Sequence, residues 1–232
     1  MKKIYIICDS FGNNLAEKEY SESQIETFWV DIFKDSFKDM EVQNFSVGSQ
    51  DLQTILDIWI KLLPEIKEDD ILIVCSPYYS RYRFPRDENY YKKVGNITIR
   101  HIGQVGDYDI SNNELEFFNQ TYNRYNLLEK LSYNEIINSS KASTLNYKEI
   151  IESLLKLTKC KSFLFSWTRF KDGYKPDTLK DKGDLEKEIG YWGTKDGLYK
   201  KTNGKYGIIG DLHWDATMHR KFADYVIKFF KQ

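Results

Sequence analysis

The chain has 232 residues, a length that suits one domain, 1–232, with a full hydrophobic core. Its 34 Lys and Arg nearly balance its 35 Asp and Glu, and the net charge of −1 argues against a basic surface for nucleic acid. The three cysteines are widely spaced and the three histidines are scattered, so we expect neither a disulfide framework nor a metal site. The N-terminal apolar run is too short for a signal peptide, and no run is long enough to span a membrane, which predicts a cytoplasmic protein.

The first third of the chain alternates between predicted strands and helices. Apolar and β-branched runs predict buried strands over residues 3–8, 40–47 and 70–76. Apolar side chains at helical spacing predict helices over 23–37 and 49–66. The apolar face predicted for the second helix consists of Leu52, Ile55, Leu56, Trp59, Ile60 and Leu63.

The rest of the chain contains fewer clear elements and two long stretches without regular periodicity. Residues 77–111 and 168–205 are predicted to be loops over an active face, the first with a short strand within 96–103. The other predicted elements are helices over 112–158, a strand over 161–167, a short fifth strand over 206–210 and a helix from Asp215 to Phe230. This alternation predicts a mainly parallel sheet with helices on both faces.

Four polar or small residues fall where such a sheet binds ligands, beyond the carboxyl ends of its strands. Ser10 follows the first strand, Gly48 follows the second, and Asp211 and His213 precede the last helix. A serine can act as a nucleophile when a histidine takes its proton and an acid orients that histidine. Each residue alone has an ordinary explanation as a turn, a helix cap or a loop residue. Their occurrence together, in this order, favours a Ser-His-Asp site.

Three segments resemble the sequence blocks of the SGNH, or GDSL-like, hydrolase superfamily. "ICDSFG" resembles the Gly-Asp-Ser block, with Cys8 where glycine is usual, and "NFSVGSQ" resembles the second block. "GDLHWDATMHRKFADYV" resembles the last block, in an Asp-x-His-Trp form. The resemblance implies that Ser10 is the nucleophile and His213 the base. It also implies that Gly48 donates a backbone N–H to the oxyanion and that His219 corresponds to the family's second histidine, for which we expect a structural role.

The resemblance also implies a fold and a chemistry. It predicts a flavodoxin-like three-layer α/β/α sandwich with a five-strand, mainly parallel sheet in the order 2-1-3-4-5. No cofactor or metal is expected. The Asp-x-His-Trp form resembles a subgroup of the superfamily that acts on polysaccharide acetyl groups, so an O-acetylated carbohydrate is the favoured substrate. Asp9, next to the nucleophile, is predicted to be a turn and hydrogen-bonding residue.

One block of the family is missing from this chain. Members carry Gly-x-Asn-Asp after the third strand, and the Asn side chain donates to the oxyanion. This chain has "CSPYYSRYRF" there, with neither Asn nor Gly. Ser76, Ser80 and Arg81 are the candidates for the replacement donor, while the amides of Ser10 and Gly48 supply the other two. Loss of one donor costs on the order of 10²–10³ in rate.

Aromatic and arginine side chains gather in the stretch after the third strand. Aromatic faces can pack on sugar rings and arginine can hold an anionic group, which predicts a wall of the substrate site. The predicted substrate-binding residues are Tyr78, Tyr79, Arg81, Tyr82 and Trp167. The alternative is that these residues serve only loop packing and a solvated charged surface.

The sequence therefore predicts a serine esterase that removes O-acyl or O-acetyl groups from a carbohydrate or another small ester. Two alternatives stay open: a carbohydrate-binding or assembly protein that kept the fold and lost turnover, and an O-acyltransferase that uses the same triad. A phosphate-binding α/β protein fits less well, because "CDSFGNN" is not a P-loop and that function leaves "DLHW" unexplained. The expected partner is a small-molecule or glycan ester, with no role for nucleic acid or membrane.

Overall fold

The computed structural model describes residues 1–12, 28–46, 52–76, 82–84, 91–94, 97–100, 103–105, 147–167, 170, 175–190, 201–202, 205–206 and 216–232. Its main sheet has four parallel strands in the order β2-β1-β3-β8. The strands are β1 (Lys3–Ile7), β2 (Glu41–Asn44), β3 (Ile71–Cys75) and β8 (Lys161–Phe165). The mixed α/β class is confirmed, and so are the first four positions of the predicted strand order.

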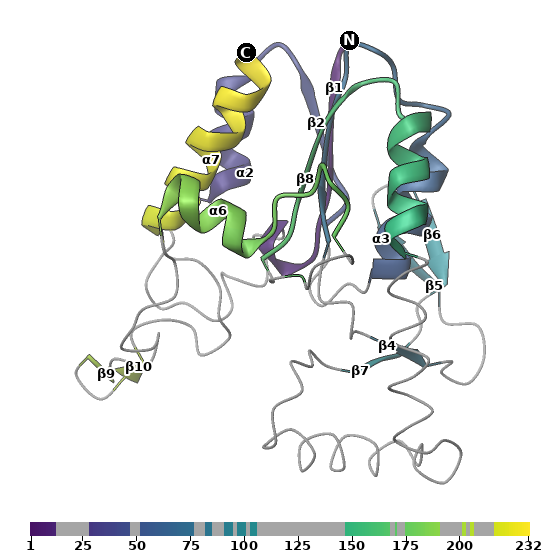
Figure 1. Ribbon diagram of the computed structural model, residues 1–232. Coiled ribbons are helices and arrows are strands. Elements are labelled where there is room, and N and C mark those ends of the chain that lie inside the picture. The colour runs from purple at the N-terminus through teal and green to yellow at the C-terminus, as the bar shows by residue number, and fades with distance from the viewer. Residues whose placement is uncertain are drawn as a thin grey trace, which may run out of the picture.

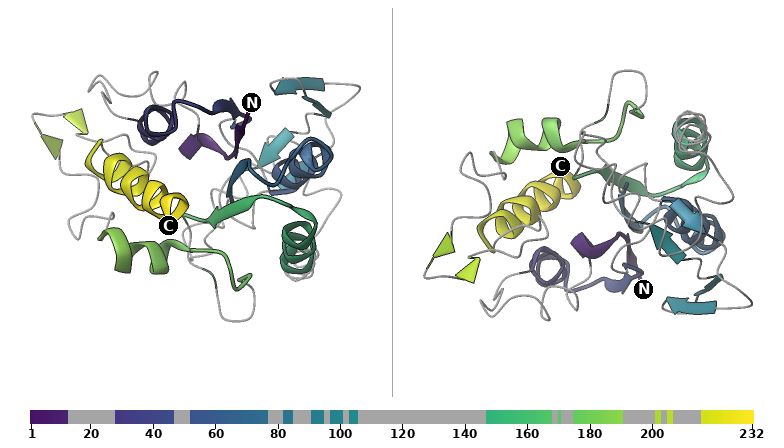
Figure 2. Two further views of the ribbon diagram at one scale, coloured as in Figure 1. Left: turned by 90° about the horizontal axis from the view of Figure 1, so that it is seen from above. Right: turned by 90° about the horizontal axis from the view of Figure 1, so that it is seen from below.

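Helices cover both faces of this sheet (Figure 1). One face carries α2 (Trp29–Ser36), α6 (Lys182–Ile189) and α7 (Ala216–Lys231), and the other carries α3 (Leu52–Leu62) and the helical residues 147–157. The views from above and below in Figure 2 show the same two groups on either side of the strands. Among the described residues, no helix combines the length and the apolar character needed to cross a membrane.

The alternation of side chains along each strand divides the core into two clusters. In β1, Ile4 and Ile6 pack on the side of α2 and α7, whereas Tyr5 and Ile7 pack on the side of α3. Every residue of β3 is buried, as expected for a strand covered on both faces. The sequence predicts that Phe222, Ala223, Val226, Ile227 and Phe230 of α7 face inward; the first three are 0% exposed, and the last two are partly buried against the same cluster.

One side chain of the predicted apolar face on α3 points outward. Ile60 is 47% exposed, whereas its neighbour Trp59 is 0% exposed. Successive residues on a helix are about 100° apart, so Ile60 cannot share the centre of the face that Trp59 occupies. Ile58 and Leu62, on the opposite flank of Trp59, are fully buried instead.

A fifth parallel strand over 206–210 is not confirmed. Of that segment only Tyr206 is described, and it belongs to β10 (Lys205–Tyr206), which pairs antiparallel with β9 (Lys201–Thr202). Beyond β8, Lys180 instead forms a single parallel bridge with Phe165. The bridge is supported by hydrogen bonds from Lys180 N to Leu164 O at 2.9 Å and from Ser166 N to Lys180 O at 2.9 Å.

Both stretches predicted as long loops contain regular structure. Within 77–111 there are two antiparallel pairs: β4 (Tyr82–Phe84) with β7 (Gly103–Val105), and β5 (Tyr91–Val94) with β6 (Ile97–Arg100). The short strand predicted within 96–103 is thus confirmed as β6. Within 168–205 lies α6, where only Leu185 and Ile189 are buried apolar side chains, a pattern too sparse to predict a helix.

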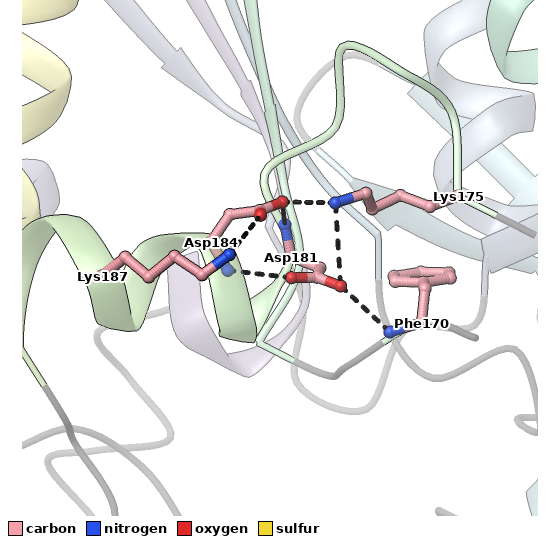
Figure 3. A network of polar contacts seen from close by, with 5 residues as sticks. All are labelled: Phe170, Lys175, Asp181, Asp184 and Lys187. Atoms are coloured by element: carbon pink, nitrogen blue, oxygen red, sulfur yellow. Dashed lines mark hydrogen bonds and ion pairs between the residues drawn. The ribbon is translucent and has the colours of Figure 1, made fainter. Parts of the chain in front are cut away.

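The start of α6 is fixed by a reciprocal capping box. Asp181 accepts from the backbone N of Asp184 at 3.0 Å, and Asp184 accepts from the backbone N of Asp181 at 3.4 Å. Lys175 contacts both carboxylates, and Lys187 lies 3.8 Å from Asp184 Oδ1 (Figure 3). The helix ends at Ile189, and its C-cap residue, Gly190, has a φ of 91°, in the region that glycine adopts freely.

This network makes the stability of the protein depend on pH through Asp184. Burial by itself would raise the pKa of Asp184, but Lys175, the Asp181 backbone and Lys187 outweigh it and lower the pKa below its ordinary value. A lowered pKa in the folded state adds stability above the unfolded pKa of about 4, and that stability is lost as pH falls through the folded pKa. Asp184→Asn is therefore expected to lower the free energy of unfolding at pH 7, with a gap to wild type that narrows below about pH 4.

Urea denaturation at pH 7, 5, 4 and 3 measures that gap. Asp177→Asn is the matched control, since it makes the same change of charge at an exposed position of the same segment. A difference in the free energy of unfolding between wild type and Asp184→Asn that stays constant over this pH range would contradict a lowered pKa of Asp184.

Candidate active site

The candidate nucleophile begins a tight turn at the carboxyl end of β1. Ser10 is the first residue of η1 (Ser10–Gly12), a single 3-10 turn that follows β1 after two buried residues. The turn is closed by a hydrogen bond from Gly12 N to Asp9 O at 3.1 Å. Phe11 N also donates to Asp9 Oδ1 at 3.1 Å, so the carboxylate of Asp9 caps the turn from within. The backbone of Ser10 is thereby held at the edge of the sheet.

Asp9 is the polar centre beneath this turn. The residue is 0% exposed, and its Oδ2 accepts from Trp167 Nε1 at 2.9 Å. The Trp167 ring stacks on Phe11 with centroids 4.9 Å apart, so one aromatic pair covers the carboxylate. Because buried carboxylates need hydrogen-bond partners, these donors explain how Asp9 is tolerated in the core. The predicted role of Asp9 in a turn and its hydrogen bonds is confirmed.

Two thiols complete the surroundings of Asp9. Cys8 Sγ lies 3.6 Å and Cys75 Sγ 3.9 Å from Asp9 Oδ1, and both cysteines are 0% exposed. Burial first, and then the neighbouring Cys75 and Asp9, raises the pKa of Cys8 well above its ordinary value. The Cys8 thiol therefore stays protonated, and both thiols lie within reach of the carboxylate as weak donors. Cys8, Asp9 and Cys75 are residue types that can bind metals, but the two carboxylate oxygens of Asp9 already accept hydrogen bonds from Phe11 N and Trp167 Nε1.

The same turn also contacts the segment that follows β2. Asn44 Nδ2 donates to Gly12 O at 2.8 Å, and Ser46 N donates to Asn44 Oδ1 at 3.0 Å. Gly12 lies so close to this segment that a Cβ atom there would be 2.3 Å from Ser46 Oγ. From Ser46 the chain runs on to Gly48, the predicted oxyanion donor, which lies outside the described residues.

Ser76 follows β3 and is 3% exposed. Its backbone is held on both sides, by Ser76 N donating to Phe165 O at 2.7 Å and by Ser166 Oγ donating to Ser76 O at 2.6 Å. Its own hydroxyl, in contrast, has no hydrogen-bond partner within the described part of the chain. A buried hydroxyl without a partner is costly, so the hydroxyl of Ser76 is available as a hydrogen-bond donor at this edge of the sheet.

The structure brings together only part of the predicted site. Ser10, Ser76 and Trp167 follow β1, β3 and β8, whose carboxyl ends share one edge of the sheet. The predicted residues Gly48, Tyr78, Tyr79, Ser80, Arg81, Asp211 and His213 lie outside the described residues, and Tyr82 is described only as the first residue of β4. His219 is 0% exposed on α7 and packs its ring 5.0 Å from that of Phe28, a position in the core.

Two positions in this region were not recognised from the sequence in their observed roles. Trp167 was predicted to face the substrate, but the structure places it 6% exposed, with its indole N–H on Asp9. The sequence predicts no separate role for Asn44, although Asn44 lies in the segment "NFSVGSQ" that resembles the family's second block. The one available signal for Asn44 was a polar amide at a strand end next to a predicted site.

Neither the known protein families nor the curated proteins contain a match to this sequence. Among solved structures, the chain is similar to that of protein YXIM_BACsu from Bacillus subtilis, with a TM-score of 0.36 and 11% sequence identity. The similarity covers 72% of this chain and 33% of that one, so this chain spans about a third of the length of the Bacillus protein.

Proposed function

We propose that this protein is a serine ester hydrolase of the SGNH kind, with a flavodoxin-like sheet that a fifth strand completes. The observation that carries the proposal is the position of Ser10 on the sheet. The chain passes from β1 to β2 on one side and returns to β3 on the other side of β1. In open α/β sheets this reversal of direction creates the crevice where ligands bind. Ser10 opens its turn beside that crevice, directly after β1.

The proposed reaction is a two-step acyl transfer. Ser10 Oγ attacks the ester carbonyl while His213, oriented by Asp211, takes the serine proton and passes it to the departing alcohol. Water, deprotonated by His213, then attacks the acyl-serine, releases the carboxylic acid and restores Ser10. The oxyanion of each tetrahedral intermediate accepts from the backbone N–H groups of Ser10 and Gly48.

We assign the third oxyanion donor to Ser76. It occupies the strand end where the resembling family carries its Gly-x-Asn-Asp block, and β3 neighbours β1 in the sheet. Its buried hydroxyl, which has no partner among the described residues, supports this choice over Ser80 and Arg81. A hydroxyl donates one hydrogen bond, as the missing amide would to the oxyanion.

The proposed substrate is an O-acylated, above all O-acetylated, carbohydrate. The support is the Asp-x-His-Trp form of the last block together with the tyrosines and arginine that follow β3. Tyr78, Tyr79, Arg81 and Tyr82 would then contact the sugar. Trp167 is better suited to hold Asp9 and the turn than to form an open wall, since it is 6% exposed.

Labelling with a fluorophosphonate probe, followed by peptide mass spectrometry, tests this proposal. We expect an adduct on Ser10 that is absent in Ser10→Ala and His213→Ala. Hydrolysis of acetylated sugars should be lost in both variants, because removal of a triad serine or histidine costs on the order of 10⁶ in kcat. Ser36→Ala, a serine at the opposite edge of the sheet where α2 ends, is the matched control and should label normally.

The outcomes separate the proposal from its alternatives. A folded wild-type protein that gives no Ser10 adduct and no hydrolysis would overturn the esterase assignment in favour of a binding protein. An adduct combined with transfer of the acyl group to an added acceptor sugar, rather than to water, would identify an acyltransferase.

A further inference from the structure

The side chain of Asn44 joins two separate parts of the candidate site. Its Nδ2 donates to the carbonyl of Gly12 at 2.8 Å, and its Oδ1 accepts from the amide of Ser46 at 3.0 Å. Gly12 ends the turn that Ser10 begins, and Ser46 lies on the segment that leads to Gly48. One amide group thus connects the turn of the nucleophile with the segment of the second oxyanion donor.

Close backbone packing between the same two segments makes this connection stiff. A Cβ atom on Gly12 would lie 2.3 Å from Ser46 Oγ and 2.5 Å from Cys8 Cβ. The strand ladder also continues past β2, since Phe45 N donates to Ile6 O at 2.7 Å. The two segments therefore touch directly, and the Asn44 amide bridges them at the point of contact.

Asn44 itself does little for the core. Its side chain is exposed at the last position of β2, whereas the turn residues on both sides of Ser10 are buried. Asn44 is exposed and hydrogen-bonds to backbone groups of two segments. We therefore attribute its role to the alignment of those segments rather than to the filling of the core. Removing Asn44 should cost modest stability, because one of its two hydrogen bonds is exposed and the other is only partly buried.

We propose that Asn44 is a positioning residue that sets the spacing between the Ser10 turn and the segment carrying Gly48. This inference rests on the proposed function, in which the amides of Ser10 and Gly48 hold one oxyanion. Donors of this kind act on the transition state, and misplacement by about 1 Å can cost on the order of 10²-fold in rate. Asn44 variants should therefore lower kcat and leave KM within about threefold of wild type.

Two substitutions separate the contributions of the two Asn44 hydrogen bonds, to Gly12 O and from Ser46 N. Asn44→Asp keeps an acceptor for Ser46 N but removes the donor to Gly12 O, while Asn44→Ala removes both. We expect each to lower kcat and the rate of Ser10 labelling by about 10- to 100-fold, with melting temperatures near that of wild type. Gln43→Ala is the matched control, since it removes a neighbouring amide of β2 that bonds to Glu41 rather than to the turn.

Amide hydrogen exchange gives a readout that does not need enzymatic activity. In both Asn44 variants the Phe11 and Gly12 amides should exchange about five- to tenfold faster, whereas the Ser46 amide should lose protection only in Asn44→Ala. Unchanged exchange of the turn in both variants would overturn the inference, and so would a wild-type kcat. Faster exchange in a protein whose wild type neither labels nor hydrolyses would uphold the bridge and refute the proposed function instead.

Discussion

Asp9→Ala is expected to lower the free energy of unfolding by about 3–5 kcal/mol. The carboxylate is 0% exposed and accepts from Phe11 N and Trp167 Nε1, so its removal strands two buried N–H donors. Each stranded donor costs about 1–3 kcal/mol, and the thiols of Cys8 and Cys75 lose a weaker partner as well. Chemical denaturation of wild type and variant measures the loss.

Asp70 provides the matched control for this effect. It is 3% exposed at the opposite edge of the sheet and also accepts from two N–H groups, Lys3 N at 2.7 Å and Lys67 N at 2.8 Å. Asp70→Ala should be destabilising too, but only Asp9→Ala should accelerate hydrogen exchange of the Ser10 turn beyond the change in global stability. A cost below about 1 kcal/mol for Asp9→Ala would contradict the role of its carboxylate as the centre of this turn.

The second large effect is expected at Trp29 on α2. Trp29→Ala should cost about 3–5 kcal/mol, because its ring is 0% exposed and packs edge-on against Phe165 and Phe222 at centroid distances of 6.2 Å and 5.2 Å. Its indole N–H also donates to the carbonyl of Phe11 in the Ser10 turn. Trp29→Phe keeps most of the packing and removes this hydrogen bond.

Trp59 on α3 is the matched residue for this comparison. It is also 0% exposed, and its indole N–H donates to Thr158 Oγ1 at 3.0 Å, on the other face of the sheet. Trp59→Phe and Trp29→Phe should each cost about 1–2 kcal/mol by denaturation, but only Trp29→Phe should loosen the turn in hydrogen exchange. Equal exchange of the turn in the two variants would show that Trp29 supports the core alone.

The strands of the main sheet could be predicted because each lies in a run rich in apolar and β-branched residues, although only β3 is buried along its whole length. β3 reads as a continuous apolar run, and its five residues are all buried. The face of α3 was predicted less well, because Ile58, Trp59 and Ile60 are consecutive apolar residues and only Ile60 of the three points outward. α6 was missed because its stability depends on the Asp181 capping box and on Lys175, polar contacts that carry no hydrophobic period.

The candidate site could be predicted as residue types at strand ends but not as a network. The position of Ser10 after β1 follows from the sequence, and the structure agrees. The contact between Trp167 and Asp9 joins residues 158 positions apart, and no local pattern contains that distance. Asn44 hydrogen-bonds to backbone groups of Gly12 and Ser46, which any residue could supply. The side chains of its partners therefore give no sign of these contacts in the sequence.

Asp9 is buried and holds this turn, so the turn can be retained for folding whether or not Ser10 takes part in a reaction. A relative without any activity would still depend on Asp9, Phe11 and Gly12 for folding, because Asp9 holds the turn from within and Gly12 packs closely on Ser46. The residues Asp-Ser-Phe-Gly in a distant relative would then indicate common ancestry, but they would say little about whether that relative is an active enzyme.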